Sequence, residues 1–435
     1  MDVNAALRYL DEHVNLEATA GRVEGLSLQR MRALASVLGN PQHAYPVIHV
    51  TGTNGKGSTT RMITELLRQS GLAVGTYTSP HLEAINERLA YDGRPIDDDE
   101  LAAVIGDLSN VEPLLDQRPS YFELLTAGAF RWFADRGVDV AVVEVGLLGR
   151  WDATNVVDAV VAVLTNVGHD HTDGIGDWRR RIAEEKAGIV KPGSTFVLGE
   201  TDPDLTDVFA ATPAAEIWRR GDQFDCDRND LALGGRMIDL RTPAGHIEDV
   251  HLPLHGAYQG DNAAAALAAA EAFFGRALQE DLVREAFAGV EVPGRFEVVH
   301  HEPLVILDGA HNLDGATAEA ATLREAFTLT GSVVRVVGML AGRDPLDMLE
   351  AMGAADAGYV IACTPASPRG IPAAEVAAAA DRLGVVAEAV PNTGEALARA
   401  LSFATSEDAI IVSGSLYVVG EARSALRRSA PEVAQ

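Results

Sequence analysis

A glycine-rich segment carrying one lysine is the part of this chain whose residue types point most directly to chemistry. Residues 47–60 read VIHVTGTNGKGSTT, so an apolar run is followed at once by three closely spaced glycines, Lys56 and a run of hydroxyl side chains. Glycines let backbone N–H groups turn toward an anion, a lysine reaches the outer phosphates, and Ser58 or Thr59 offers a hydroxyl to a phosphate or its Mg2+. The segment therefore predicts a cradle for nucleotide phosphates.

The spacing departs in one place from the strict P-loop pattern, because Gly57 stands between Gly-Lys and Ser58. A plain glycine-rich turn between a strand and a helix is the alternative. The apolar run before the glycines and the helical pattern of MITELLRQ after them favour the phosphate cradle. The chain has only three lysines, Lys56, Lys186 and Lys191, which sets the lysine of this loop apart from a chance surface charge.

Acidic and histidine side chains follow two further apolar runs. Glu144 lies near the end of VDVAVVEVG, and the sequence GHDH follows the run VVAVLTNV. Ligands of doubly wound sheets bind outside the carboxyl ends of the strands, so these side chains are expected at the same edge as the glycine loop. A carboxylate at Glu144 can meet Mg2+. His169, Asp170 or His171 can act as a metal ligand or base, with a purely structural histidine as the alternative.

Two more clusters carry reactive side chains. Lys186 stands in EEKAGIV on a predicted helix, where Glu184 and Glu185 favour an exposed, ion-paired lysine. The sequence LDGAHN closes a strand in the C-terminal part of the chain and offers Asp308 to a ribose or an amine and His311 to an anion or a substrate. Small turn residues without a chemical role are the alternative interpretation of this second cluster.

Length and composition limit the class of protein to which this chain can belong. With 435 residues, 47% of them hydrophobic, the chain can bury a large core and is expected to form two or three domains. Its apolar runs fall short of the roughly 20 residues that span a bilayer, and MDVNAALRYLDEH lacks the pattern of a secretory signal, so we expect a cytoplasmic protein with no membrane partner. Cys226 and Cys363 are too few for a disulfide framework and are not spaced as metal ligands.

The net charge of −28, from 63 acidic and 35 basic residues, argues against nucleic acid as a partner. Two explanations of the charge stay open, namely adaptation to a cytoplasm of high salt, where repulsion is screened, and an ordinary acidic protein. If the first holds, activity and the free energy of unfolding should rise from low to multimolar KCl. Full stability without salt would favour the second.

Apolar strand-like runs alternate with helical stretches, which is typical of a parallel α/β sheet. A first series contains PVIHV, VDVAVVEVG, VVAVLTNVG, AGIVKP and STFVLG. An Ala-rich helix at 263–274, preceded by the turn and candidate cap LHGAYQGDN, is expected to close this series. A second series begins near Pro293 and contains EVVHHEPLVILDGAHN, a helix at 315–328, SVVRVVGML, GYVIACTP and DAIIVSGSL.

The predicted fold class is therefore α/β, with a P-loop domain built on a mostly parallel sheet over residues 1–292 and a smaller Rossmann-like domain over 293–435. A linker is expected at 291–296, where Pro-Gly-Arg interrupts the pattern. Residues 201–247 carry short, irregular polar stretches and are expected to form a peripheral excursion.

Taken together, these clusters are similar to the motifs of a known family. The chain resembles the folylpolyglutamate synthases and dihydrofolate synthases of the Mur ligase superfamily along nearly its whole length. The matching pieces, in the order of the family, are IHVTGTNGKGS, YTSPHL, NERL, YFELLT, EVGLLGRWDATNVV, VGHDHTDGIG, EKAGIVKPG, QGDNAAAA, PGRFE, DGAHN and VSGSLYVVGEA.

The resemblance implies a Mur-ligase-like central P-loop domain and a C-terminal glutamate-ligase domain, whose closure would complete the site. It also implies the reaction. ATP phosphorylates a substrate carboxylate, and the amine of L-glutamate attacks the acyl phosphate to give an amide, ADP and phosphate. Catalysis of this kind depends mainly on positioning and charge neutralisation. The implied small-molecule partners are ATP, L-glutamate and dihydropteroate, a reduced folate or both, with Mg2+ and K+ as cations and a monomeric protein.

Site residues follow from the matching motif positions. The implied nucleotide contacts are Asn54, Gly55, Lys56, Gly57, Ser58, Asn262, Arg295 and Asp308. The implied Mg2+ ligands are Ser79, Glu144 and His171, and the implied catalytic residues are Lys56, Lys186, His171 and His311, the last toward glutamate or phosphate. In the family the lysine of EKAGI is carbamylated by CO2, which here is Lys186 and reverses the ion-paired interpretation. The pteridine is implied to contact Phe122, Asp152 and the loop near 23–26.

Some positions depart from the family pattern and bear on fine substrate contacts. His169 replaces a usual Leu and is expected beside the metal site without ligating the metal, LLGRW replaces LGGRL, GLSLQRM replaces an LGLERI-like segment, and Leu313 replaces Pro. The alternatives are another amide ligase of the superfamily, a nucleotide-binding regulator without catalysis, and a P-loop kinase. The pieces YFE and DATN argue against the first, and the presence of Lys56, Glu144 and Lys186 argues against the second.

Overall fold

A computed structural model describes residues 1–15, 27–169 and 176–429, and its contacts divide the chain into two compact units. The first unit contains the described residues up to Pro253 together with Tyr258–Glu291. The second contains Leu254–Ala257 and the described residues from Val292 onward. Among the described residues, no helix is both long and apolar enough to cross a membrane.

The first unit is built on an eight-stranded sheet in the order β4-β3-β2-β5-β1-β6-β7-β8. The six strands β2, β5, β1, β6, β7 and β8 pair in parallel, and only β3 and β4 at one edge pair antiparallel, which confirms the predicted mostly parallel α/β sheet. The strands are β1 Val47–Thr51, β2 Val74–Tyr77, β3 Leu89–Tyr91, β4 Arg94–Pro95, β5 Val140–Glu144, β6 Ala159–Leu164, β7 Thr195–Leu198 and β8 Glu216–Arg219.

Strands β1, β5 and β6 lie at the centre of this sheet, and all five residues of β1 are buried. This explains the continuous apolar runs in the sequence, because a parallel sheet is covered on both faces. Val50 of β1 lies opposite Glu144 of β5, so the glycine loop after β1 and the Glu144 carboxylate leave the sheet at the same edge. The strand-end expectation for these two motifs is confirmed.

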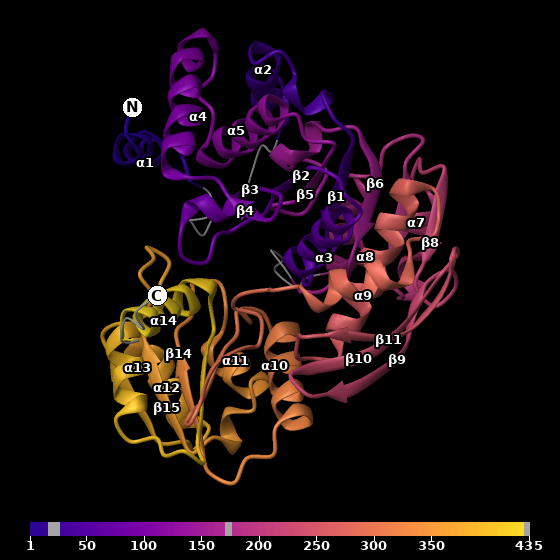
Figure 1. Cartoon of the computed structure of the whole chain (residues 1–435). Helices are drawn as coiled ribbons and strands as arrows, with labels where there is room; N and C mark the ends of the chain where they lie inside the picture. The colour runs from indigo at the N-terminus through magenta and orange to yellow at the C-terminus, as the bar shows by residue number, and fades with distance from the viewer. Residues whose placement is uncertain (16–26, 170–175, 430–435) are drawn as a thin grey trace, which may run out of the picture. The chain divides into compact units, whose positions relative to one another are not determined.

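Helices cover the sheet, as Figure 1 shows for α3, which lies next to α8 and α9. Local sequence defines their ends: Ser120 and Glu123 form a capping box at the start of α5, and Gly137 ends the same helix in the left-handed conformation. The helices of this unit are α1 Val3–Asp11, α2 Gln29–Val37, α3 Lys56–Gln69, α4 Asp98–Val111, α5 Tyr121–Arg136, α6 Trp178–Ala187, α7 Thr206–Ala210, α8 Tyr258–Phe274 and α9 Glu280–Ala288.

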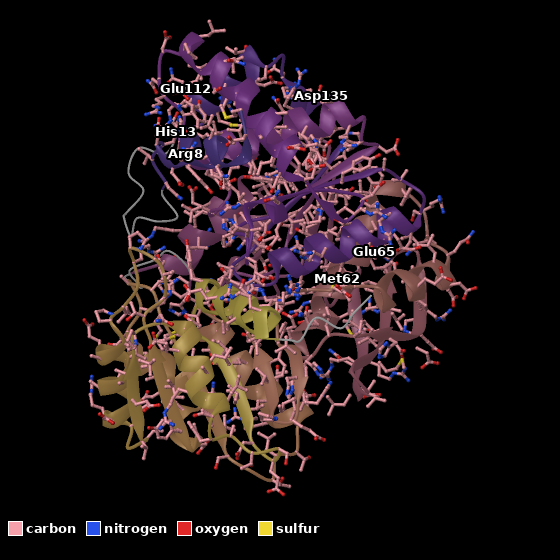
Figure 2. All side chains as sticks on the ribbon, turned by 60° about the vertical axis from the view of Figure 1, so that its left-hand side comes forward. Arg8, His13, Met62, Glu65, Glu112 and Asp135 are labelled. Atoms are coloured by element: carbon pink, nitrogen blue, oxygen red, sulfur yellow. The ribbon has the colours of Figure 1, made fainter. Side chains whose placement is uncertain are left out.

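One apolar core of the first unit joins α1, α2, α4 and α5 to one face of the sheet, including Val47 of β1 and Val143 of β5. A polar contact fastens α1 at the rim of this core. His13 Nε2 lies 2.8 Å from Glu112 Oε2, and Figure 2 shows these two side chains together. The N-terminal helix is thus tied to the 3-10 turn η3 (Glu112–Leu114) that follows α4.

Residues 201–252 differ from the irregular excursion expected for 201–247. Strand β8 extends the main sheet, and β9 Asp225–Ala232, β10 Gly235–Thr242 and β11 Gly245–Leu252 form a separate antiparallel sheet. Every second residue of β10 is buried, as expected for strands with only one covered face. Polar residues on the other face made the segment look irregular in sequence.

Two other local expectations were wrong. The segment AGIVKP is not a strand: Ile189 and Val190 are buried against α6 and β7 while their N–H groups bond back to Lys186 and Ala187 in turns. In addition, YQGDN belongs to α8 itself and does not precede it. Glycine is needed at position 260 inside this helix, because a Cβ there would overlap the Asn229 side chain of β9.

The second unit contains a six-stranded sheet in the order β12-β13-β17-β14-β15-β16, parallel except for β12. This confirms the Rossmann-like expectation. Its strands are β12 Glu297–His301, β13 Leu304–Leu307, β14 Val333–Val337, β15 Tyr359–Cys363, β16 Ala387–Val390 and β17 Ala409–Ser413. Its helices are α10 Leu313–Ala326, α11 Pro345–Ala351, α12 Ala373–Arg382, α13 Thr393–Leu401 and α14 Leu416–Ser429. Helix α10 starts and ends two residues before the predicted bounds, because Asn312 caps it.

Candidate active site

The glycine loop between β1 and α3 adopts a conformation that only glycine permits at two positions. Gly52 and Gly55 have φ angles of 152° and 82°, and Gly55 is the residue that precedes helix α3. A Cβ on Gly52 would overlap the Thr165 side chain, and a Cβ on Gly55 would overlap the Asn262 amide. The loop therefore leads into the N-terminus of a 14-residue helix, where backbone N–H groups favour an anion.

Replacing Gly55 with alanine is expected to raise the KM for ATP by more than about tenfold, because left-handed strain of about 1–2 kcal/mol and displacement of Asn262 both distort the loop. Gly71 is the matched control, since its φ is 87° and a Cβ there would meet nothing within 4 Å. Steady-state kinetics of both alanine variants at saturating acceptor measure the difference. Equal KM values for ATP would contradict the role of the loop.

Two of the three lysines meet at this loop. Lys56 Nζ donates to the carbonyl oxygens of Gly52 at 3.0 Å and Thr53 at 3.1 Å, and Lys186 Nζ donates to the same Gly52 oxygen at 2.7 Å. Lys186 is only 1% exposed, so the exposed placement that its flanking glutamates favour is wrong. Those glutamates instead lie near arginines, Glu184 3.4 Å from Arg180 and Glu185 3.6 Å from Arg150.

Two residues at the end of β6 hold the loop and were missed by sequence reasoning. Asn166 Oδ1 accepts from the Asn54 N–H at 3.0 Å, and Asn166 Nδ2 donates to the Asn54 carbonyl at 3.0 Å. Thr165 Oγ1 donates to the same carbonyl at 2.6 Å. The signal in the sequence was the polar pair Thr-Asn directly after a buried apolar strand, at the edge where ligands bind.

Glu144 and Ser79, two of the three predicted metal ligands, lie together beside the loop. Glu144 is 4% exposed, and its Oε2 accepts from the Ser79 N–H at 3.2 Å. A Cβ on Gly57 would lie 3.6 Å from Glu144 Oε2. A carboxylate and a serine hydroxyl are oxygen donors of the kind that Mg2+ prefers, so these residues fit the ion.

Of the two histidines in the GHDH sequence, the structure describes only one. His171 lies outside the described residues. His169 is exposed, and its ring centroid lies 4.0 Å from that of Trp178. Within residues 1–15, 27–169 and 176–429, no group of three or more His, Cys, Asp or Glu side chains is placed to hold a metal ion.

The two predicted pteridine contacts are brought to one loop, the segment that follows β5. A Cβ on Gly146 would overlap the Phe122 ring, and the Leu147 N–H donates to Asp152 Oδ2 at 2.7 Å. Asp152 is 6% exposed, and burial raises its pKa while hydrogen bonds from Thr154 and this loop oppose the shift. The third predicted contact, residues 23–26, lies outside the described residues.

Asp308, Arg295 and His311 belong to the second unit. Asp308 is 5% exposed and accepts from the N–H groups of Phe296 and Ala310, each at 2.8 Å, so it orders the segment around Arg295 as well as its own turn. Burial, together with the negative charge of Glu319, raises the pKa of Asp308 to about 7, and Arg295 opposes this. A Cβ on Gly309 would overlap the Arg295 guanidinium.

His311 lies in the turn that joins β13 to α10. Its Nδ1 is 2.8 Å from the Gly309 carbonyl, which fixes the tautomer of the neutral ring with the proton on Nδ1. Its own carbonyl accepts from Arg343 Nε at 3.0 Å. The turn therefore holds the side chain of His311, and Arg343 holds its backbone carbonyl.

Comparison with known proteins agrees with this arrangement. The model of the Mur ligase middle domain matches residues 50–270, and that of the Mur ligase glutamate ligase domain matches residues 294–416. The dihydrofolate synthase/folylpolyglutamate synthase of Mycobacterium tuberculosis is 38% identical over 92% of this chain and 90% of its own length. The chain belongs to the dihydrofolate synthase/folylpolyglutamate synthase family. The resemblance seen in the motifs is thereby confirmed.

Solved structures of this family share the whole fold. The folylpolyglutamate synthase of Mycobacterium tuberculosis in complex with ADP has a TM-score of 0.91 and 37% identity, and the match covers 99% of this chain and 100% of that one. A bifunctional folylpolyglutamate synthase/dihydrofolate synthase with Mn, AMPPNP and L-glutamate bound has a TM-score of 0.86 and 30% identity, with 98% of both chains covered. Membership of the dihydrofolate synthase/folylpolyglutamate synthase family makes this protein an ATP-dependent ligase.

Proposed function

We propose that this protein joins L-glutamate to the carboxylate of a pteroate or folate through an acyl phosphate. The carboxylate attacks the γ-phosphorus of ATP and releases ADP; the glutamate amine then attacks the acyl carbon, loses a proton and expels phosphate. The observation that carries the proposal is the convergence of Lys56 and Lys186 on the Gly52 carbonyl, in a loop bordered by the Glu144 carboxylate. The Lys56 cation and the Glu144 carboxylate beside a helix N-terminus suit triphosphate chemistry, and Lys186 lies at the same loop.

Nucleotide binding is assigned to both parts of the chain. In the first unit, Asn54, Gly55, Lys56, Gly57 and Ser58 would hold the phosphates, with Asn262 packed against Gly55. In the second, Arg295 and Asp308 would contribute the remaining contacts. We assign residues 1–292 to the ATP- and pterin-binding domain and 293–435 to the glutamate-ligase domain, in a monomeric cytoplasmic protein.

Ser79, Glu144 and His171 would hold Mg2+, which when bound neutralises charge on the transferring phosphate. The position of Glu144 supports this, because its carboxylate is 4% exposed, lies beside the loop and accepts from the Ser79 N–H, and a bound cation offsets the cost of burying its charge. K+ is proposed as an additional cation from the family resemblance alone.

Lys186 is proposed to be carbamylated: its ammonium first loses a proton, and the neutral amine then adds to the carbon of CO2 with loss of a second proton. The product is an anion where the unmodified side chain is a cation. The position of Nζ, buried and 2.7 Å from the Gly52 carbonyl, would place that anion at the phosphate loop, where it could help to hold a metal. His311 is proposed to contact the incoming glutamate or the phosphate.

The acceptor is proposed to be dihydropteroate, a reduced folate or both. Phe122 offers an aromatic face for stacking, and Asp152 offers carboxylate oxygens to the N–H groups of a pteridine ring. Their placement on one loop supports a shared role.

The decisive experiment supplies ATP, Mg2+ and L-glutamate with each pteridine separately and measures ADP together with the glutamyl amide product. We expect ADP and amide in equal amounts with at least one acceptor. ADP release without amide formation would favour a kinase, and a protein inert with both acceptors would overturn the proposal.

A further inference from the structure

A line of buried polar groups runs from strand β1 to the carboxylate of Asp152. His49 lies in the middle of β1 and is fully buried, and its Nε2 lies 2.8 Å from Thr154 Oγ1. Thr154, also fully buried, donates its hydroxyl to Asp152 Oδ1 at 2.5 Å, and its N–H donates to the same oxygen at 3.0 Å. Three polar side chains, separated by up to 105 positions in sequence, are thus joined inside the apolar core.

The direction of these bonds follows from the number of hydrogens. Thr154 has one hydroxyl hydrogen, and because it is given to Asp152, the oxygen must accept from His49. His49 is therefore neutral with its proton on Nε2. Burial, followed by the positive charge of Lys191, lowers the pKa of His49 to about 3, which agrees with a neutral ring.

The other nitrogen of His49, Nδ1, favours one direction of these hydrogen bonds over the reverse. Nδ1 is buried and has no hydrogen-bond partner within the part of the chain that the structure describes. If Asp152 took up a proton and donated to Thr154, the hydroxyl would turn to His49 Nε2, and the His49 proton would move to Nδ1. That would bury a donor without an acceptor, which is costly. The line of bonds therefore favours an ionised Asp152.

We propose that His49 and Thr154 are positioning residues that hold the Asp152 carboxylate ionised and in one orientation, and thereby set the affinity for the pteridine acceptor. This inference rests on the proposed function, in which Asp152 accepts from the pteridine. A carboxylate oxygen that is already bonded to Thr154 and a second one bonded to Leu147 cannot rotate without losing these bonds. Such preorganisation raises affinity, because the carboxylate loses little conformational entropy when the ligand binds.

Thr154→Val tests the proposal, because it keeps the shape of the side chain and removes the hydroxyl. We expect the KM for the acceptor to rise by about tenfold or more, as for loss of a hydrogen bond to a charged group, while the KM for ATP stays within about twofold. Thr154→Ser is the matched control and should restore the acceptor KM, because it keeps the hydroxyl.

A second pair of variants, at His49, tests the proposal even if Thr154→Val does not fold. His49→Leu abolishes the donor to Thr154 and should raise the acceptor KM several-fold, whereas His49→Gln can still donate and should stay near wild type. The double variant with Thr154→Val should be no worse than Thr154→Val alone. Acceptor KM values equal to wild type in both Thr154→Val and His49→Leu, or in His49→Leu alone if Thr154→Val does not fold, would overturn the inference. Failure of the proposed function would show differently, as a wild-type protein inactive with both pteridines.

Discussion

Lys56→Ala is expected to abolish turnover, with a loss of at least about 10³-fold in kcat, while the protein stays folded. Lys56 is the first residue of α3, and its ammonium donates to the Gly52 and Thr53 carbonyls. In the proposed reaction this ammonium leaves the carbonyls to meet the outer phosphates of ATP. Without it, the charge that develops during phosphoryl transfer has lost its nearest cation in the loop.

The measurement is ADP and amide formation under saturating substrates, with thermal unfolding to show that Tm is kept within a few degrees. Arg68→Ala is a suitable control because Arg68 lies on the same helix, is paired with Glu65 and lies outside the glycine loop. It also removes one positive charge and should leave kcat nearly unchanged. Lys56→Ala with kcat within tenfold of wild type would refute the assigned role.

Lys186→Ala should cause a loss of similar size, for a different reason. Its Nζ is buried at the loop, so the substitution removes the only atom of this side chain that can be carbamylated and leaves the Gly52 carbonyl with one donor fewer. Because a cavity also forms, we expect a destabilisation of roughly 2 kcal/mol or more from truncation of a long buried side chain. Lys186→Met fills most of that space and should separate the chemical effect from the packing effect.

Lys191→Met is the matched control for Lys186→Met. Lys191 is the third lysine, and its Nζ donates to the Asn155 carbonyl at 3.1 Å, away from the Gly52 carbonyl. We expect Lys186→Met to lose at least about 10³-fold in kcat but to bind ADP with nearly wild-type affinity, since ADP lacks the γ-phosphate, and Lys191→Met to keep kcat within about threefold. A carbamate carbon signal after exposure to ¹³CO2, lost in Lys186→Met, would identify the modification. Near-normal kcat in Lys186→Met would exclude a catalytic role for this lysine.

Much of the fold could be predicted from local pattern. The alternation of apolar runs and helical stretches predicted both parallel sheets, because strands covered on two faces are apolar over most of their length. Where only one face is covered, as in β10, polar residues interrupt the pattern and the strand was not recognised. Apolar residues also misled at Ile189 and Val190, which are buried by packing in a turn and not by pairing in a sheet. Burial alone does not specify strand.

The sequence by itself determined the glycine loop and the family, because a loop between a strand and a helix depends on neighbouring residues and the motifs stand in a fixed order. Only the tertiary structure decided which distant side chains meet. Lys186 reaches the Gly52 carbonyl across 134 positions, although its neighbours predicted an exposed lysine, and His49 reaches Thr154 across 105. Such contacts follow from strand order and helix packing. The spacing of residues along a chain carries no distance information once the chain has crossed between strands.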